Sequence, residues 1–183
     1  MARSRRAAAP PSGSPPSGVG TAPAPSLASA ILPRVWQGLG YRLLPDAAVA
    51  RTLFDFAAVP WPTRDAIAFA WGVFDGGDRL VGALTAESAE RALMFHGPVV
   101  VTHDDPLEAA AQLVAAALDH STALGVETVF SRPLGLDRVW VRFGFIPVPE
   151  STLPGALAGR PGAGLYAWRG GTALWTLRES PRS

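Results

Sequence analysis

The chain has 183 residues, which suits one domain with a tail and is enough to bury a substantial core. All 16 basic residues are arginine, and 15 acidic residues bring the formal charge to +1. The absence of cysteine excludes disulfides, thiolate metal ligands and a cysteine nucleophile. Arginines are not concentrated in any core segment as a nucleic-acid surface would require, and no apolar run approaches the ~20 residues that span a bilayer. We therefore expect no nucleic-acid or membrane partner, and a cytoplasmic location.

Residues 1–33 form a tail rich in Pro, Ser, Gly and Ala, exemplified by Pro10–Gly18. Such a segment has almost nothing to bury, so we expect the first 30 or so residues to be disordered and dispensable for folding. A single domain should then cover residues 34–178, with a short C-terminal tail at 179–183.

The first elements are expected from Gly40 onward. Tyr41–Leu44 is a candidate first strand, and Asp46 is a plausible N-cap for a helix that reaches Phe56. That helix would present Val49, Leu53 and Phe56 on one apolar stripe, while Trp36 and Trp61 would lie in irregular segments.

Two apolar runs, residues 66–74 and 79–86, flank Asp75-Gly-Gly-Asp78, which is typical of a hairpin because glycine adopts positive φ readily. Residues 91–101 form another predicted strand, which Gly97-Pro98 interrupts as an edge or a bulge.

The strongest helix signal runs from Pro106 to Leu124. Asp105 is the natural N-cap, Pro106 suits the first helical position, and Gly125 is placed to end the helix. Its predicted buried stripe is Leu107, Ala111, Val114, Leu118 and Ser121. The remaining predicted elements are a strand at 126–130, a helix at 136–143, and strands at 165–168 and 173–177 around Gly170-Gly171. Strands that alternate with helices, with hairpins at both ends, predict an α/β (α+β) fold with a mixed, mostly antiparallel sheet and helices on both faces.

This element order over residues 40–170 resembles the GNAT acyltransferase superfamily. Leu80-Val-Gly-Ala83 and the ending Val139-Trp-Val-Arg-Phe-Gly-Phe145 also carry the resemblance. It implies acetyl-CoA as a cosubstrate, with no tightly bound cofactor. The donor would lie along the strand and turn formed by Val99, Val100, Val101, Thr102 and His103.

The turn before the long helix departs from the family pattern. GNAT proteins bind the coenzyme A pyrophosphate there through an Arg/Gln-x-x-Gly-x-Gly/Ala signature at a helix N-terminus. In this chain the turn reads Val101-Thr-His-Asp-Asp-Pro-Leu-Glu108, which lacks glycine and arginine and carries up to three negative charges. Like-charge repulsion therefore predicts weak binding of coenzyme A.

The residues that would perform the chemistry are also altered. Trp140 stands where the family often has a tyrosine acid, and Ser131 stands where asparagine is frequent. Three candidate catalytic residues remain: Ser131, Glu87 as a general base or a surface-loop glutamate, and His96 as a proton acceptor beside the interrupted strand. His103 with its acidic neighbours matches no known metal-ligand spacing, so no metal site is predicted.

The sequence leaves three functions open. The first is transfer of an acyl group from acyl-CoA to a small-molecule or peptide amine. The second is a catalytically silent GNAT-like module used for binding or dimerisation, including a homodimer. The third is a relative of the Fem-type peptidyltransferases, which His96-Gly-Pro-Val-Val100 resembles and which use aminoacyl-tRNA.

Overall fold

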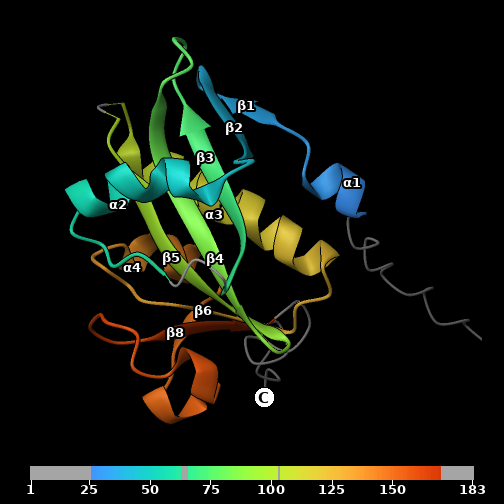
Figure 1. Cartoon of the computed structure of the whole chain (residues 1–183), viewed down its shortest axis with the longest axis vertical. Coiled ribbons are helices and arrows are strands. Elements are labelled where there is room, and N and C mark those ends of the chain that lie inside the picture. Colours follow the sequence, from blue (N-terminus) through green and yellow to red (C-terminus); the bar gives the residue numbers. More distant parts are fainter. Residues whose placement is uncertain (1–25, 63–65, 103, 170–183) are drawn as a thin grey trace, which may run out of the picture.

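The structure, a computed structural model, describes residues 26–62, 66–102 and 104–169 (Figure 1). Within them one sheet has the strand order β1-β2-β3-β4-β5-β6-β8-β7. Its strands are β1 Arg34–Trp36, β2 Leu39–Leu43, β3 Ile67–Phe74, β4 Leu80–Ala89, β5 Ala92–Val100, β6 Thr128–Ser131, β7 Ile146–Pro147 and β8 Tyr166–Arg169. Neighbours are antiparallel except for β5 and β6, which are parallel. The predicted mixed, mostly antiparallel sheet is confirmed.

The helices lie on both faces of this sheet. They are α1 Leu27–Ala30, the 3₁₀ turn η1 Ala47–Ala50, α2 Arg51–Phe56, α3 Pro106–Ala123, α4 Asp137–Arg142, and the 3₁₀ turns η3 Glu150–Thr152 and η4 Gly155–Leu157. Figure 1 shows α2 crossing in front of the strands and α3 behind them. No helix within the described ranges is long and apolar enough to cross a membrane.

Alternation along the strands builds a separate core on each face. On β5, Leu93 and Phe95 pack with the helix α3, whereas Met94 packs on the opposite face with Phe130 and Leu157. The cluster beneath α2 includes Phe54. Because successive side chains point to opposite faces, these clusters fix which residues of β4 and β5 face α3 and which face α2.

The β3–β4 hairpin forms as predicted, but its turn uses a different residue from the one expected. Asp78 adopts positive φ (+60°), whereas the adjacent glycines do not. The Asp75 carboxylate accepts hydrogen bonds from the backbone N–H groups of Gly77 and Arg79, both at 3.0 Å. Side-chain hydrogen bonding by an aspartate therefore shapes this turn, together with the tolerance of Asp78 for the left-handed region.

The interruption at Gly97-Pro98 is a bulge within the sheet. Thr85 of β4 pairs with His96 and Ala83 pairs with Val99, so two residues of β5 oppose one of β4. Gly97 has φ +87°, and a Cβ there would lie 3.0 Å from the carbonyl oxygen of Ala83. Glycine is required by both the backbone conformation and the lack of space.

The helix α3 is the element best predicted from the sequence. Asp105 accepts a hydrogen bond from the N–H of Glu108 at 3.1 Å, Pro106 is the first helical residue, and Gly125 has φ +72° after the helix. Most of the predicted stripe is buried. Leu107 is half exposed instead, because the first turn of α3 lies at the margin of the sheet.

Two predictions near the N-terminus are wrong in detail. The buried residues of η1 and α2 are Ala50 and Phe54, while Val49 and Phe56 are exposed, because the first turn is 3₁₀ and changes the helical phase. Trp36 belongs to β1 and not to an irregular segment. Leu27–Ala30 form α1, in which Ala30 is buried.

The C-terminal part of the chain is partly described. Tyr166–Arg169 forms β8, as predicted for 165–168. The predicted strand at 173–177 and its glycine pair lie outside the described residues. The short strand β7 and the turns η3 and η4 were not predicted, because proline-rich sequence carries no periodic pattern.

Candidate functional site

The parallel pair β5–β6 separates at the centre of the sheet. The two strands pair from Ala92 with Thr128 to Phe95 with Ser131. Beyond that point β5 continues through the bulge to Val100, whereas β6 ends, so in the described chain β5 has no strand neighbour on that side. His96 is the first residue of β5 past the last paired position. The bulge at Gly97-Pro98 follows directly, and a bulge bends the strand that carries it.

His96 meets Glu87 on the face of the sheet opposite α3. The imidazole Nε2 lies 2.8 Å from the Oε2 of Glu87. Glu87 is a residue of β4 that is 1% exposed, and His96 is 11% exposed. The interpretation of Glu87 as a surface-loop glutamate is wrong, because β4 extends to Ala89 and carries Glu87 into the sheet. The structure thus brings together two of the three predicted catalytic residues.

The geometry of this pair determines which histidine nitrogen can accept a proton. A carboxylate only accepts hydrogen bonds, so the neutral imidazole donates its Nε2–H to Glu87 and its Nδ1 is left as the acceptor. The pKa of His96 lies below its usual value of 6.5, chiefly because burial disfavours the imidazolium. Hydrogen bonding and charge attraction from Glu87 oppose that shift, while the charges of Arg160 and Arg132 add to it. Neutral imidazole is therefore the form present at pH 7.

Two arginines that the sequence reasoning missed complete the surroundings of the pair. Arg160, which follows η4, forms an ion pair through Nη2 with the Oε1 of Glu87. Arg132, which follows β6, is almost fully buried and pairs with Glu150, with Nη2 3.0 Å from Oε2. Its Nη1 also donates to the carbonyl oxygen of Gly164 at 2.8 Å. No motif marked these arginines, since both lie in irregular segments that only the folded chain brings to β4 and β5.

Ser131 is not part of this cluster. It is the last residue of β6, it is fully buried, and its hydroxyl donates to the carbonyl oxygen of Arg132 at 3.3 Å. It pairs in the ladder with Phe95, which faces α3. Ser131 therefore faces the side of the sheet opposite His96, and its predicted catalytic role has no support from this geometry.

A cleft of about 390 Å³ opens beside β5 beyond the separation of the strands. Its walls come from β5, from the end of α2, from the first turns of α3 and from the loop before α4, and the main contributors are Phe56, Val59, Pro98, Val99, Val100, Val101, Leu107, Leu134 and Leu136. The predicted donor residues Val99, Val100 and Val101 thus line an apolar cleft. Thr102 lies at its end beside a more polar hollow, and His103 lies outside the described residues.

The backbone of β5 offers hydrogen-bonding groups to this cleft. Val101 donates its N–H to the carbonyl oxygen of Val81 on β4 at 2.8 Å. Because successive residues of a strand direct their backbone groups to opposite sides, the N–H and C=O of Val100 point toward the separated side. An extended amide-containing molecule can pair with them as a short strand would.

The start of α3 borders the same cleft and is acidic. Asp105 occupies one free helical N–H, as described above, and Glu108 is held by Arg142 of α4 with Nη2 3.2 Å from Oε1. The hydrogen bond from Arg142, followed by that from the Gln112 side chain, keeps the pKa of Glu108 below its usual value. The charge of Glu108 is thereby balanced, while Asp104 and Asp105 have no arginine partner among the described residues. The predicted repulsion of a pyrophosphate therefore rests on these two aspartates.

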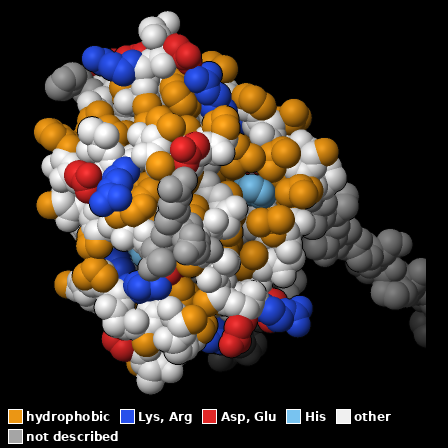
Figure 2. All heavy atoms as spheres, viewed as in Figure 1, with side chains coloured by type: hydrophobic (Ala, Val, Ile, Leu, Met, Phe, Trp, Pro, Cys, Tyr) orange, Lys and Arg blue, Asp and Glu red, His pale blue; other side chains and the backbone are white. Residues whose placement is uncertain are grey.

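A second hollow, of about 450 Å³, lies on the α2 side of the sheet. Pro45, Asp46, Arg51, Trp61, Pro62 and Ile67 contribute to its lining. Ile67 is the direct partner of Glu87 in the β3–β4 ladder, so one lining residue of this hollow is a strand neighbour of Glu87. Figure 2 shows this face with positive and negative side chains interspersed among hydrophobic ones.

Trp140 replaces the tyrosine that the resemblance leads one to expect. Its side chain is fully buried, and its ring centroid lies 5.0 Å from that of Phe145 with the rings tilted by 60°. It donates its Nε1–H to the carbonyl oxygen of Pro133 at 3.3 Å. The indole is a structural group that fixes the loop before α4, and it supplies no acid.

No protein-family model matches the sequence, and no curated protein is significantly similar to it. The similarity to known proteins lies instead in the fold of the chain.

Solved structures of GNAT acetyltransferases share this fold. A GNAT-family acetyltransferase from Staphylococcus aureus Mu50 matches with a TM-score of 0.58 at 8% identity, over 72% of this chain and 98% of the other. N-acetylglutamate synthase from Neisseria gonorrhoeae, in complex with coenzyme A and N-acetyl-glutamate, matches with a TM-score of 0.57 at 17% identity. This match covers 72% of this chain and 35% of the synthase chain. A dodecameric spermidine N-acetyltransferase from Vibrio cholerae matches with a TM-score of 0.54 at 14% identity. This match covers 79% of this chain and 100% of the other. The chain therefore has the GNAT fold, as the resemblance predicted, in a divergent sequence.

Proposed function

We propose that this protein is an N-acyltransferase that transfers an acyl group from a thioester to an amine, with His96 as the proton acceptor. The observation that carries the proposal is the neutral His96, held by the buried Glu87 where β5 and β6 separate. His96 is two residues before Pro98, which lines the apolar cleft, and its partner Glu87 pairs in the sheet with Ile67, which lines the second hollow. The cytoplasm, where acyl thioesters are available, is the expected location.

The donor belongs in the apolar cleft along β5. The amide groups of a pantetheine arm would pair with the backbone of Val100, and its chain would lie against Pro98, Leu134 and Leu136. This assignment suits acetyl-CoA as a cosubstrate that binds transiently. The acceptor amine would approach from the hollow at Trp61 and Ile67, on the side of His96 and Glu87.

The chemistry needs only one group from the protein. The amine nitrogen attacks the thioester carbonyl carbon, Nδ1 of His96 takes the proton that the nitrogen loses, and the C–S bond breaks to release a thiolate. A free thiol has a pKa near 8.5, so the thiolate can leave and take its proton from water without an acid at the Trp140 position. Positioning of the two substrates supplies much of the remaining rate.

The test is turnover with acetyl-CoA and a panel of primary amines that includes spermidine. We expect His96→Gln to lower turnover by roughly 10²-fold, the low end for the loss of a general base, because glutamine retains a hydrogen bond to Glu87 but accepts no proton. Arg91→Gln is the matched control, because Arg91 is an exposed residue away from His96. This variant should leave turnover unchanged. Equal rates for wild type and His96→Gln would sink the assignment.

The donor makes a second, independent test. Repulsion from Asp104 and Asp105 predicts that acetyl-CoA binds with a Kd in about the millimolar range. Calorimetry at moderate salt measures this directly, and Asp104→Asn should tighten binding severalfold because one opposing charge is removed. Micromolar affinity for the wild type would show that the acidic turn does not repel the pyrophosphate.

A catalytically silent module is the alternative, and the capped, acidic start of α3 is the observation that favours it. In that case acetyl-CoA should neither bind nor turn over, and the exposed apolar residues around the cleft would serve a protein contact such as a homodimer. Light scattering on the purified chain, with and without acetyl-CoA, separates this alternative from the enzyme.

A further inference from the structure

The Glu87–His96 pair has a third member that the proposed reaction does not use. The segment between β7 and β8 places Arg160 against Glu87, so that each carboxylate oxygen has its own partner: Oε2 the imidazole and Oε1 the guanidinium. Arg160 is 29% exposed, while the carboxylate between the guanidinium and the imidazole is 1% exposed. Two adjacent strands and a segment 73 residues beyond Glu87 therefore meet at one buried negative charge.

Such a charge must be balanced inside the protein, because an uncompensated buried carboxylate is strongly disfavoured. Two side chains can balance it: the guanidinium of Arg160, or the imidazolium of His96. A guanidinium is charged at every accessible pH, so with Arg160 in place the carboxylate does not need a proton on His96. Without Arg160 the same carboxylate would favour the imidazolium, which cannot accept a proton.

We propose that Arg160 is a positioning residue that neutralises Glu87 and thereby keeps His96 in its neutral, proton-accepting form. The inference rests on the proposed function for its catalytic meaning, but its electrostatic content stands on the geometry alone. It also explains why a residue from an irregular segment reaches into the sheet: the loop 148–165 delivers one charge to the site.

The other groups around His96 do not replace this one. Arg132, from the end of β6, also disfavours the imidazolium, but its charge is engaged by the half-exposed Glu150 of η3. Glu87 of β4 is the only carboxylate bonded to His96 among the described residues. Burial lowers the pKa of His96, and the charges of the two arginines lower it further. Glu87 is the group that raises it.

The experiment is an NMR titration of the histidine ring signals, with the His96 signal assigned by its loss in His96→Gln. In Arg160→Gln we expect the His96 midpoint to move to higher pH than in the wild type, because a cation that disfavours the imidazolium is gone. Arg160→Lys, which keeps the charge, should restore the wild-type midpoint. In Arg160→Gln/Glu87→Gln the midpoint should fall again, because the attracting carboxylate is removed as well.

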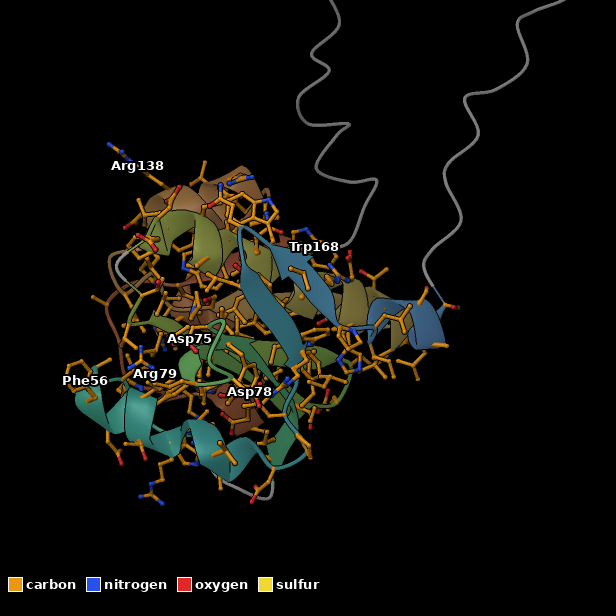
Figure 3. The ribbon with its side chains drawn as sticks, turned by 90° about the horizontal axis from the view of Figure 1, so that it is seen from above. Phe56, Asp75, Asp78, Arg79, Arg138 and Trp168 are labelled. Carbon is orange, nitrogen blue, oxygen red and sulfur yellow. The ribbon has the colours of Figure 1, made fainter. Side chains whose placement is uncertain are left out.

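Arg138→Gln is the matched control, because Figure 3 shows Arg138 projecting away from the body of the protein. It should leave the His96 midpoint unchanged. An unchanged midpoint in folded Arg160→Gln overturns the proposal. If Arg160→Gln does not fold, Glu87→Gln decides the question with Arg160 retained: the proposal requires a midpoint below that of the wild type, and an equal midpoint overturns it.

Turnover separates this inference from the function on which it rests. In Arg160→Gln, kcat/KM at pH 6 should fall roughly tenfold relative to the wild type and recover to within about twofold at pH 8.5, where His96 is again neutral. A shifted midpoint in a protein without any turnover would support the role of Arg160 and reject the acyltransferase. A normal pH profile with an unshifted midpoint would reject the role of Arg160 while leaving the acyltransferase intact.

Discussion

The two histidines that the structure describes lie in largely buried but chemically different environments. His96 is hydrogen-bonded to Glu87, and the charges of Arg160 and Arg132 also act on its ring. His120 of α3 instead stacks on Phe69 at 4.2 Å between ring centroids and lies 6.4 Å from Trp71 in an edge-on arrangement. Its Nδ1 is buried without a hydrogen-bond partner in the described part of the chain. His120 is a packing residue that carries a titratable group.

The first prediction concerns the pH dependence of stability. Burial lowers the pKa of His120 below its usual 6.5, so the unfolded chain binds a proton more readily than the folded one. The stability from the neutral ring is therefore complete above about pH 6.5 and is lost as the pH falls through the lower, folded-state pKa. His120→Phe should reduce the loss of unfolding free energy between pH 8 and pH 5, measured by urea denaturation. An identical pH slope in the variant would contradict the assignment.

At the scale of elements, the bulge of β5 links the sheet to the site. The bulge follows His96 directly, at the point where β5 loses its pairing with β6, and leads into the cleft at Val99 to Val101. Gly97 is the residue that the bulge depends on, since a Cβ would approach both the Ala83 oxygen and the Val99 nitrogen to 3.0 Å. One structural cause, the glycine bulge, therefore shapes β5 both beside the Glu87–His96 pair and along the apolar cleft.

The second prediction tests that cause. Gly97→Ala should destabilise the fold by roughly 1–3 kcal/mol, because alanine at φ +87° is strained and its Cβ meets backbone that cannot move aside. Gly40→Ala, in β2, is the control: no heavy atom lies within 4 Å of its added Cβ, so its effect should stay within about 0.5 kcal/mol. Thermal unfolding of both variants measures the difference. Equal stabilities would show that the bulge does not require glycine.

The elements differ in how well the sequence predicts them, for identifiable reasons. The helix α3 has a cap, an N-terminal proline, a C-terminal glycine and a long periodic pattern, and all of these are local signals. The hairpin at Asp75 and the break at Gly97-Pro98 are also local. The phase of α2, the strand β1 and the turns near Glu150 depend on packing against distant segments, which no window of sequence contains.

The same distinction applies to the candidate site. His96 and Glu87 were identifiable because a histidine beside a strand break and a glutamate near a strand end are recognisable in the sequence. Their hydrogen bond follows from the antiparallel register, which places Glu87 opposite Met94 and beside His96. Arg132 and Arg160 could not be identified, because 45 residues or more separate each of them from Glu87 and only the folded loop 148–165 brings Arg160 to it.

At the scale of the whole molecule, the N-terminal segment holds the edge of the sheet against α3. The helix α1 packs on α3, with Ala30 buried. The Arg34 guanidinium lies 2.8 Å from the Oδ2 of Asp119, donates to the carbonyl oxygen of Ala30 at 3.4 Å, and stands over the ring of Trp71 at 5.8 Å. This contact joins β1, α1 and the second half of α3, on the side of the sheet opposite the candidate site.

The third prediction follows from this arrangement and concerns shortening of the chain. A chain that begins at Pro33 lacks α1 and should melt about 3–5 °C below the full chain, because the apolar surface of α3 under Ala30 becomes exposed. A chain that begins at Ser26 keeps every contact that the structure describes and should melt within error of the full chain. His96 and Glu87 lie on the other face, so turnover of the shortened chain below its melting transition should equal that of the full chain. Equal melting temperatures for both shortened chains would mean that α1 contributes nothing to the stability of the domain.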